Sequence, residues 1–356
     1  MLTRKFARLF VLAILGTMVT ASSAFAQYSQ IALPLNYSWA TRYIPQPKAF
    51  DYFQGNDNGT SIRNRYLLAH LSMKVYNTSG VSDSAFEEHL QVFYGNHGVN
   101  DVQLFTDAST GADGAIFVTD DAVIVAFRGT STDSDGNRAD LYTDLDNRVK
   151  LVKVNNREVG IHQGFWTAAN SVYPEILQRV VTEVDQHNKK VWLTGHSLGG
   201  AMAMVTAFRL QYQSGIPVQG LVSYGAPRVG NDWFYKEVER SAAGTSSLIQ
   251  STQRFVLDGD PAPTYWNNGW DYRKRKHAYH HFGTTHTIFD EGSEYDFHYN
   301  SGELQMAWIP PHQIYGRLST GIHMDYEIAL YWETADLLLD AGDDHILSAF
   351  NDLPLY

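Results

Sequence analysis

A serine flanked by glycines, placed between an apolar run and an alanine-rich run, constrains the fold of this chain most strongly. Residues 195–200 read GHSLGG; they follow the apolar run 191–194 and precede a helical pattern that extends to about Gln213. A strand that turns at once into a helix needs glycines two residues on either side of the serine, where side chains would collide. We therefore expect a turn that lifts the Ser197 hydroxyl above the edge of a sheet.

β-branched and amphipathic runs alternate along the rest of the chain. The apolar runs predict strands at 114–119, 122–127, 191–194, 218–224 and 253–257. Apolar spacing of three to four residues predicts helices at 60–76, 165–189, 201–213, 232–240 and 324–339. Such alternation is typical of an α/β fold in which helices flank a mainly parallel sheet. Since the sequence shows no repeat and no low-complexity linker, we expect a single domain over residues 27–356.

The first 26 residues have the pattern of a secretory signal. Three basic residues precede the apolar run 9–15, and residues 24–26 (AFA) place small side chains where a signal peptidase reads. The alternative is an uncleaved anchor helix, but small and polar residues from Gly16 onward end the run short of about 20 apolar residues. We expect cleavage near Ala26, a mature chain that begins at Gln27, and delivery to the periplasm or the medium.

Charge and cysteine content exclude several classes of function. The chain has 27 Lys and Arg against 38 Asp and Glu, a formal net charge of −11, and no cysteine. An acidic surface repels phosphate backbones, so we expect no nucleic-acid partner. The absence of cysteine excludes disulfides, thiolate metal sites and a thiol nucleophile. Ser197 is therefore the candidate nucleophile, and no obligate protein partner is evident.

A nucleophilic serine needs a base to take its proton and an acid to orient that base. With a serine at this kind of turn, the acid and then the histidine follow in chain order. The predicted strand 253–257 leads into Asp258 and Asp260, either of which is a candidate acid or a turn-forming residue. Chain order alone does not choose among the later histidines, which are His277, His280, His281, His286, His298, His312, His323 and His345.

Together these features resemble the fungal-type class 3 lipases, a family of α/β-hydrolases that includes secreted bacterial members. The resemblance spans about residues 60–339. Besides the serine turn it includes, in the family's order, 125–130 (VAFRGT), 143–145 (TDL), 162–165 (HQGF) and 224–231 (YGAPRVGN). It implies an α/β-hydrolase fold with a mainly parallel sheet, a short lid segment after the loop at 128–130, and chemistry that needs no cofactor.

The resemblance also selects among the open candidates. The family's acid lies in an Asp-x-x-Pro segment, which residues 260–263 match, so it implies Asp260 rather than Asp258. The family's histidine lies near the C-terminus and is followed by an aromatic residue, so it implies His323, with His281 as the main rival. By position the Leu198 amide is one oxyanion donor, and by resemblance Thr130 supplies the second.

Two patterns that suggest metal ligands are not convincing. Residues 131–142 begin like a calcium loop, but Tyr142 stands where the bidentate acid is required. The histidines at 277–286 lack a matching carboxylate spacing. We expect no metal site, and we expect His162 and His196 to serve in packing or hydrogen bonding.

The substrate is the least constrained expectation. The expected lid, residues 131–140, contains no large apolar side chain and resembles that of feruloyl-esterase-like members rather than that of interfacial lipases. Aromatic residues at 265–279 are candidates for an acyl or aryl pocket, or for ordinary packing. The resemblance favours a secreted triacylglycerol lipase with transient contact to a lipid interface. A polar-lidded esterase or phospholipase, and a lipase-like protein that binds without catalysis, remain alternatives.

Overall fold

The computed structural model describes residues 48–57, 61–77, 80–129, 148–257, 260, 262–264, 279–290, 297–301, 338, 341, 343–351 and 353. The chain divides into two compact units, Met1–Gln46 and Pro47–Tyr356, and every described residue belongs to the second. Several predicted features lie outside the described residues: the signal segment 1–26, Thr130, the expected lid 131–140, Asp258, the aromatic stretch 265–278, His323 and nearly all of the predicted helix 324–339.

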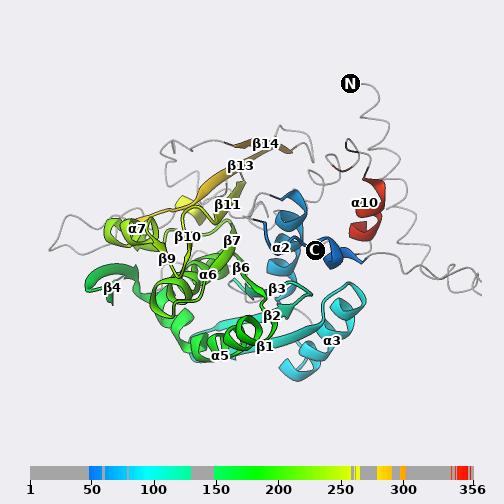
Figure 1. Ribbon diagram of the computed structural model, residues 1–356, viewed down its shortest axis with the longest axis horizontal. Helices are drawn as coiled ribbons and strands as arrows, with labels where there is room; N and C mark the ends of the chain where they lie inside the picture. Colours follow the sequence, from blue (N-terminus) through cyan, green and yellow to red (C-terminus); the bar gives the residue numbers. More distant parts are fainter. Residues whose placement is uncertain are drawn as a thin grey trace, which may run out of the picture. The chain divides into compact units, whose positions relative to one another are not determined.

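In the described part of the chain, the main sheet has eight strands in the order β1-β2-β3-β6-β7-β11-β13-β14 (Figure 1). They are β1 (Asp101–Asp107), β2 (Ala112–Val118), β3 (Ala122–Phe127), β6 (Lys190–His196), β7 (Val218–Tyr224), β11 (Thr252–Leu257), β13 (Thr284–Asp290) and β14 (Phe297–Ser301). The strands from β3 to β13 run parallel. At the edges, β1, β2 and β14 are antiparallel to their neighbours. The prediction of a mainly parallel α/β sheet is confirmed.

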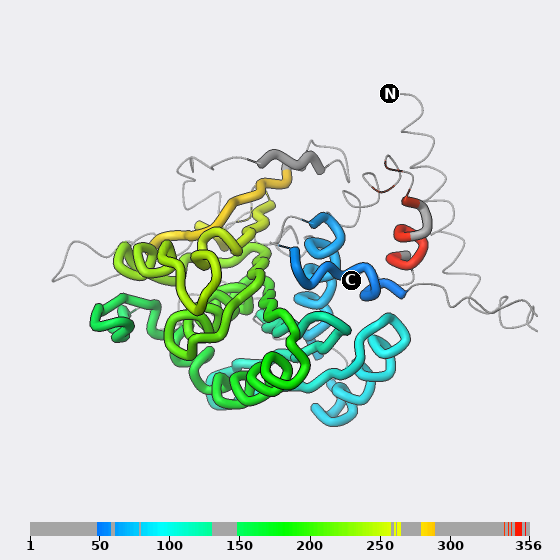
Figure 2. The backbone as a smooth tube through the Cα atoms, in the orientation of Figure 1, coloured from blue at the N-terminus to red at the C-terminus, as the bar shows by residue number. Residues whose placement is uncertain are grey.

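The central strands are apolar throughout because both faces of the sheet are covered. Alternate residues of β3 enter two different cores: Val123, Val125 and Phe127 lie in the first, and Ala122, Ile124 and Ala126 in the second. Helices α5 (Gln163–His187) and α6 (Leu198–Phe208) contribute to the first core, while α2 (Ile62–Lys74) and α3 (Asp83–Asn96) contribute to the second. Figure 2 shows α2 (blue) and α5–α6 (green) on different sides of the sheet.

Most predicted helices match the structure within a few residues. The runs 60–76 and 165–189 correspond to α2 and α5, and 232–240 corresponds to α7 (Asp232–Val238). The run 201–213 corresponds to α6 and to η3 (Arg209–Gln213), a π-helical turn that continues it. Other short elements are η2 (Ala49–Tyr52), β9 (Ser241–Ala242), β10 (Thr245–Ser247), η4 (Ala262–Thr264) and α10 (Asp344–Asn351).

A second, antiparallel sheet was not predicted. Its described strands are β12 (Tyr279–His280), β8 (Gly230–Asn231), β5 (Arg157–His162) and β4 (Val149–Val154), in that order. Asn155 and Asn156 connect β4 to β5 with φ values of 49° and 63°. Two residues with positive φ form the tight hairpin turn that asparagine tolerates better than most side chains.

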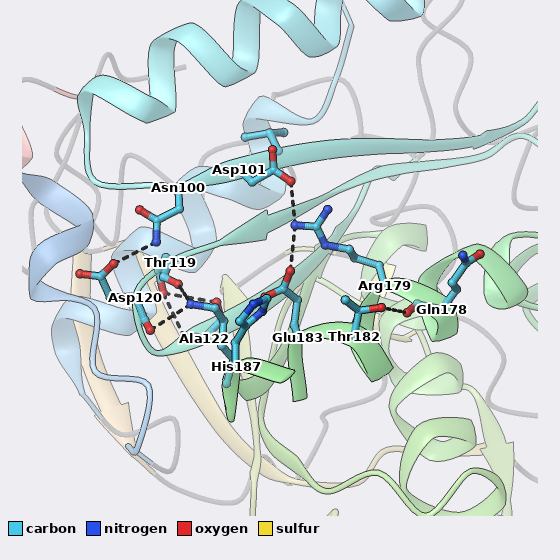
Figure 3. Close-up of polar contacts among 12 residues, drawn as sticks. Asn100, Asp101, Thr119, Asp120, Ala122, Gln178, Arg179, Thr182, Glu183 and His187 are labelled. Carbon is cyan, nitrogen blue, oxygen red and sulfur yellow. Dashed lines mark hydrogen bonds and ion pairs between the residues drawn. The ribbon is translucent and has the colours of Figure 1, made fainter. Parts of the chain in front are cut away.

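A polar cluster joins the C-terminal end of α5 to the β1–β3 edge of the main sheet (Figure 3). The buried carboxylate of Glu183 bonds to Arg179 (2.9 Å) and to His187 (2.9 Å), and Arg179 also reaches Asp101 (2.7 Å). Lys189 Nζ donates to two carbonyls of the β2–β3 turn. Because Lys189 immediately precedes β6, these bonds fix where the strand that leads into Ser197 begins.

Candidate active site

Ser197 occupies a strained turn between β6 and α6. Its φ of 56° and ψ of −125° are values that L residues rarely adopt. The Ser197 amide donates to the carbonyl of Tyr224 on β7 (2.8 Å), and its own carbonyl accepts from the amide of Gly200 (3.0 Å). The predicted strand–turn–helix unit is therefore present, and neighbouring main-chain bonds hold the serine in its unfavourable conformation.

The glycines on either side of Ser197 lie where main-chain segments touch. A Cβ atom on Gly195 would collide with the main chain of Gly199 and lie 2.7 Å from the nitrogen of Gly200. A Cβ atom on Gly199 would collide with the carbonyl oxygen of Phe127 at the end of β3. The first turn of α6 thus contacts the ends of both β6 and β3, as the GxSxG pattern requires.

The segment before Thr130 lies directly against the serine. A Cβ atom on Gly129 would lie 2.6 Å from the carbonyl oxygen of His196 and 3.2 Å from Cβ of Ser197. Arg128, one residue earlier, forms an ion pair with Asp113 on β2. Leu198 is the first residue of α6, so its amide has no acceptor within the helix. Leu198 and Gly129 therefore bring two main-chain segments together beside Ser197, while Thr130 itself lies outside the described residues.

Asp260 follows β11 in a short turn. Its side chain is buried, its amide donates to the carbonyl of Leu257 (3.0 Å), and its Oδ1 accepts from the amide of Ala262 (2.9 Å). Parallel strands bring their carboxyl ends to one edge of a sheet, and only β7 separates β6 from β11. Ser197 and Asp260 therefore lie at the same edge of the main sheet.

His281 supports the turn that contains Asp260. Its Nε2 bonds to the carbonyl of Pro263 (2.7 Å), so this nitrogen carries a hydrogen. Burial, followed by the nearby positive charges of Arg254 and Arg228, holds the pKa of His281 well below its ordinary value. Burial also lowers the pKa of Arg228 to about 10, and this guanidinium donates to the carbonyl of Thr264 (2.9 Å). The His281 imidazole and the Arg228 guanidinium thus both brace the main chain after Asp260.

His162 and His196 have structural contacts, as expected from their motifs. His162 is the N-cap of α5: its Nδ1 accepts from the amide of Phe165 (3.4 Å) and its ring stacks on the Phe165 ring. His196 Nδ1 bonds to the hydroxyl of Tyr76 (3.1 Å). Tyr76 carries no signal in the sequence, because it follows the end of α2 and reaches the site only through the tertiary fold.

Within the described ranges, no group of three His, Asp or Glu side chains is placed to hold a metal ion. His280 pairs with Asp232 of α7. Nor does any helix of those ranges combine the length and hydropathy needed to cross a bilayer.

A parallel-centred sheet, helices on both faces and a strained serine at the strand–helix turn define the α/β-hydrolase fold. A solved structure of this fold, the triacylglyceride lipase of Rhizomucor miehei, is 20% identical and has a TM-score of 0.52. The match covers 69% of this chain and 86% of that one.

Sequence comparisons point to one family within this fold class. Residues 124–269 match the model of the family described as lipase (class 3). The secreted mono- and diacylglycerol lipase LIP4 of Malassezia restricta is 27% identical over 164 residues, which are 46% of this chain and 53% of that protein. Secreted mono- and diacylglycerol lipase 1 of Fusarium solani is 43% identical over 105 residues, or 29% of each chain. Over residues 124–269 this chain is similar to the class 3 lipase family, and it spans only about half or less of these relatives' length.

Proposed function

We propose that the protein is a carboxylic ester hydrolase that acts on lipid esters through an acyl-enzyme on Ser197. The observation that carries this proposal is the strained backbone of Ser197 at the β6–α6 turn, inside the segment that matches the family. A strained residue persists only where its surroundings impose the conformation, and such positions cluster at functional sites. Ser197 is buried, with an exposed fraction of 3% for the whole residue.

The proposed reaction has two halves. His323 takes the proton of the Ser197 hydroxyl as its oxygen attacks the ester carbonyl, and Asp260 orients the imidazole. The amides of Leu198 and Thr130 stabilise the oxyanion. His323 then returns the proton to the departing alcohol. Water, activated by the same histidine, hydrolyses the acyl-enzyme, releases the acid and regenerates Ser197. The contacts of Asp260 support its role, because its amide donates to the Leu257 carbonyl and its Oδ1 accepts from the Ala262 amide, which together hold the residue in the turn.

Among lipid esters we propose triacylglycerols as the first candidate substrates, because the Rhizomucor structure is named a triacylglyceride lipase. The names of the Malassezia and Fusarium relatives specify mono- and diacylglycerols. The polar sequence of residues 131–140 favours the alternative, an esterase for soluble short-chain or aryl esters. Because both fungal relatives are named as secreted, we further propose export and cleavage near Ala26.

The test is hydrolysis of p-nitrophenyl butyrate, p-nitrophenyl palmitate, emulsified triolein and methyl ferulate by the wild type and by Ser197→Ala. The proposal expects wild-type cleavage of the palmitate ester and triolein, a rise in rate above the solubility limit, and a loss of about 10⁴-fold or more in the variant. Cleavage confined to butyrate or ferulate assigns the esterase function. No cleavage of any ester by a folded wild type supports the binding protein instead.

A second pair of variants tests the histidine. His323→Ala should lower kcat by at least about 10³-fold with little change in the thermal midpoint. His281→Asn should lower the thermal midpoint and retain most of the activity at low temperature, because His281 braces the Pro263 carbonyl. The reverse pattern would assign the base to His281.

A further inference from the structure

Tyr76 and His196 form a buried pair close to Gly129 and Ser197. The Tyr76 hydroxyl bonds to His196 Nδ1 at 3.1 Å across 120 residues of sequence, and their rings lie 6.4 Å apart. The exposed fractions are 9% for Tyr76 and 1% for His196. His196 is the last residue of β6 and immediately precedes Ser197, so the pair connects the end of α2 to the nucleophile's own strand.

Both partners are held firmly. The hydroxyl of Thr194 on β6 donates to the carbonyl of Leu68 (3.3 Å), which fixes α2 against the strand two residues before His196. The main chain of His196 pairs with Tyr224 on β7. A hydrogen bond between two elements that are already fixed can set a distance accurately, because little residual motion remains in either partner.

The Tyr76 hydroxyl also touches the segment that leads into Thr130. A Cβ atom placed on Gly129 would overlap that hydroxyl, and it would lie 2.6 Å from the His196 carbonyl oxygen and 3.2 Å from Ser197 Cβ. The hydroxyl therefore lies where the Gly129 main chain, the end of β6 and the serine converge. A larger or smaller group at this point would change how closely Gly129 approaches Ser197.

We propose that Tyr76 is a positioning residue for the oxyanion site. Its hydroxyl, oriented by His196, limits the approach of the Gly129 main chain to Ser197, and Gly129 is the last described residue before the proposed second oxyanion donor. This inference rests on the proposed function. A displacement of about 1 Å at such a donor costs roughly 10²-fold in rate, so one hydroxyl that touches no substrate can control turnover.

The principal variant is Tyr76→Phe, which removes the hydroxyl and keeps the ring. The matched control is Tyr173→Phe, because Tyr173 is a buried tyrosine whose hydroxyl bonds to the side chain of Ser214 (2.7 Å). With p-nitrophenyl butyrate, Tyr76→Phe should lower kcat about 10- to 100-fold. KM should stay within about twofold and the midpoint of the pH–rate profile should not move, because substrate binding and the base are untouched. Tyr173→Phe should keep kcat within about twofold at a similar change in thermal midpoint.

Two substitutions of His196 separate positioning from packing. His196→Asn keeps a polar atom close to the position of Nδ1, whereas His196→Gln places its polar group near that of Nε2. The contact with Tyr76 uses Nδ1, so the Asn variant should retain more of kcat than the Gln variant. Adding Tyr76→Phe should lower kcat further in the Asn background and change it little in the Gln background.

Labelling of Ser197 by a fluorophosphonate, followed by mass spectrometry, separates the possible failures. If the wild type neither cleaves ester nor takes up the label, the proposed function fails and the role of Tyr76 fails with it. If the wild type cleaves and is labelled, but Tyr76→Phe matches Tyr173→Phe in kcat, only the inference about Tyr76 is overturned. A loss of activity in Tyr76→Phe that appears wholly in KM, or tracks the fall in thermal midpoint, overturns it as well.

Discussion

The side chain of Asn231 accepts a hydrogen bond from the amide of Gly160 (3.1 Å), and so links α7 to the second sheet. The same oxygen also accepts from the amides of Trp233 and Phe234, at 3.1 Å each, and caps the N-terminus of α7. The exposed fraction of Asn231 is 1%. A single buried oxygen thus satisfies three main-chain donors from two elements.

Asn231→Ala should lower the free energy of unfolding by about 2–3 kcal/mol, because buried amides lose their acceptor. Asn231→Asp keeps an acceptor oxygen and should cost less than half as much. The measurement is urea denaturation followed by circular dichroism. The control is Ser82→Ala at the cap of α3, where one exposed bond to the Ala85 amide predicts a loss of about 1 kcal/mol or less. Equal losses at Asn231 and Ser82 would contradict this account of the cap.

Substitution of glycine by alanine should have opposite effects on protein stability at two positions, Gly195 and Gly95. Gly195→Ala forces a Cβ atom onto the main chain of α6 and should destabilise the protein by at least about 2 kcal/mol. Gly95→Ala adds a methyl group to α3 where the nearest atom, Gln91 Nε2, lies at 3.7 Å. This variant should stabilise by up to about 1 kcal/mol, because alanine favours helix over glycine. Thermal unfolding of both variants measures the difference, and a neutral Gly195→Ala would refute the described packing.

The ion pair between Arg128 and Asp113 should contribute more to the free energy of unfolding than a surface ion pair does. Both side chains are 20% exposed, and the Thr106 hydroxyl also donates to Asp113. Asp113→Asn should therefore cost about 1–3 kcal/mol of unfolding free energy, since it leaves a partly buried guanidinium without its charge partner. Asp101 is 46% exposed, and its partner Arg179 keeps Glu183. Asp101→Asn should consequently cost less than about 1 kcal/mol in the same chemical denaturation experiment.

Buried His286 predicts acid sensitivity. Burial, followed by the charge of Arg65, lowers the pKa of His286 from 6.5 to about 4. Below pH 6.5 the unfolded chain binds a proton that the folded protein does not bind until about pH 4, so the unfolding free energy falls as the pH drops through this window. In His286→Gln the new side chain can still bond to Gln253. The unfolding free energy should then depend less steeply on pH, by the equivalent of at most about one bound proton. Denaturation curves at several pH values between 7 and 4 give that slope, and an unchanged slope would contradict the buried neutral imidazole.

Much of the fold followed from local sequence patterns. The GHSLGG turn, the buried strand before it and the long helix α5 are encoded by residues close together in the chain, where periodicity and glycine placement are informative. The position of Asp260 at the same sheet edge as Ser197 agrees with the order expected for this fold. Thr130 and His323 remain predictions, because both lie outside the described residues.

Other features could not be read from the sequence, for physical reasons. Strands β8 and β12 have two residues each, which is too short for any periodicity to show. Their pairing depends on how distant segments meet in the folded chain. The role of Asn231 in joining two elements, and the contact of Tyr76 with His196 and Gly129, likewise arise only from tertiary structure.

The direct contact between the Gly199 main chain and the end of β3 has a consequence for how this protein can diversify. Where two segments contact each other through main-chain atoms, replacing nearby side chains changes the distance between the segments very little. Selection for new substrates would therefore have to act on residues farther from Ser197. Libraries built for altered selectivity should leave the 195–200 turn and Gly129 fixed and randomise the loops around them.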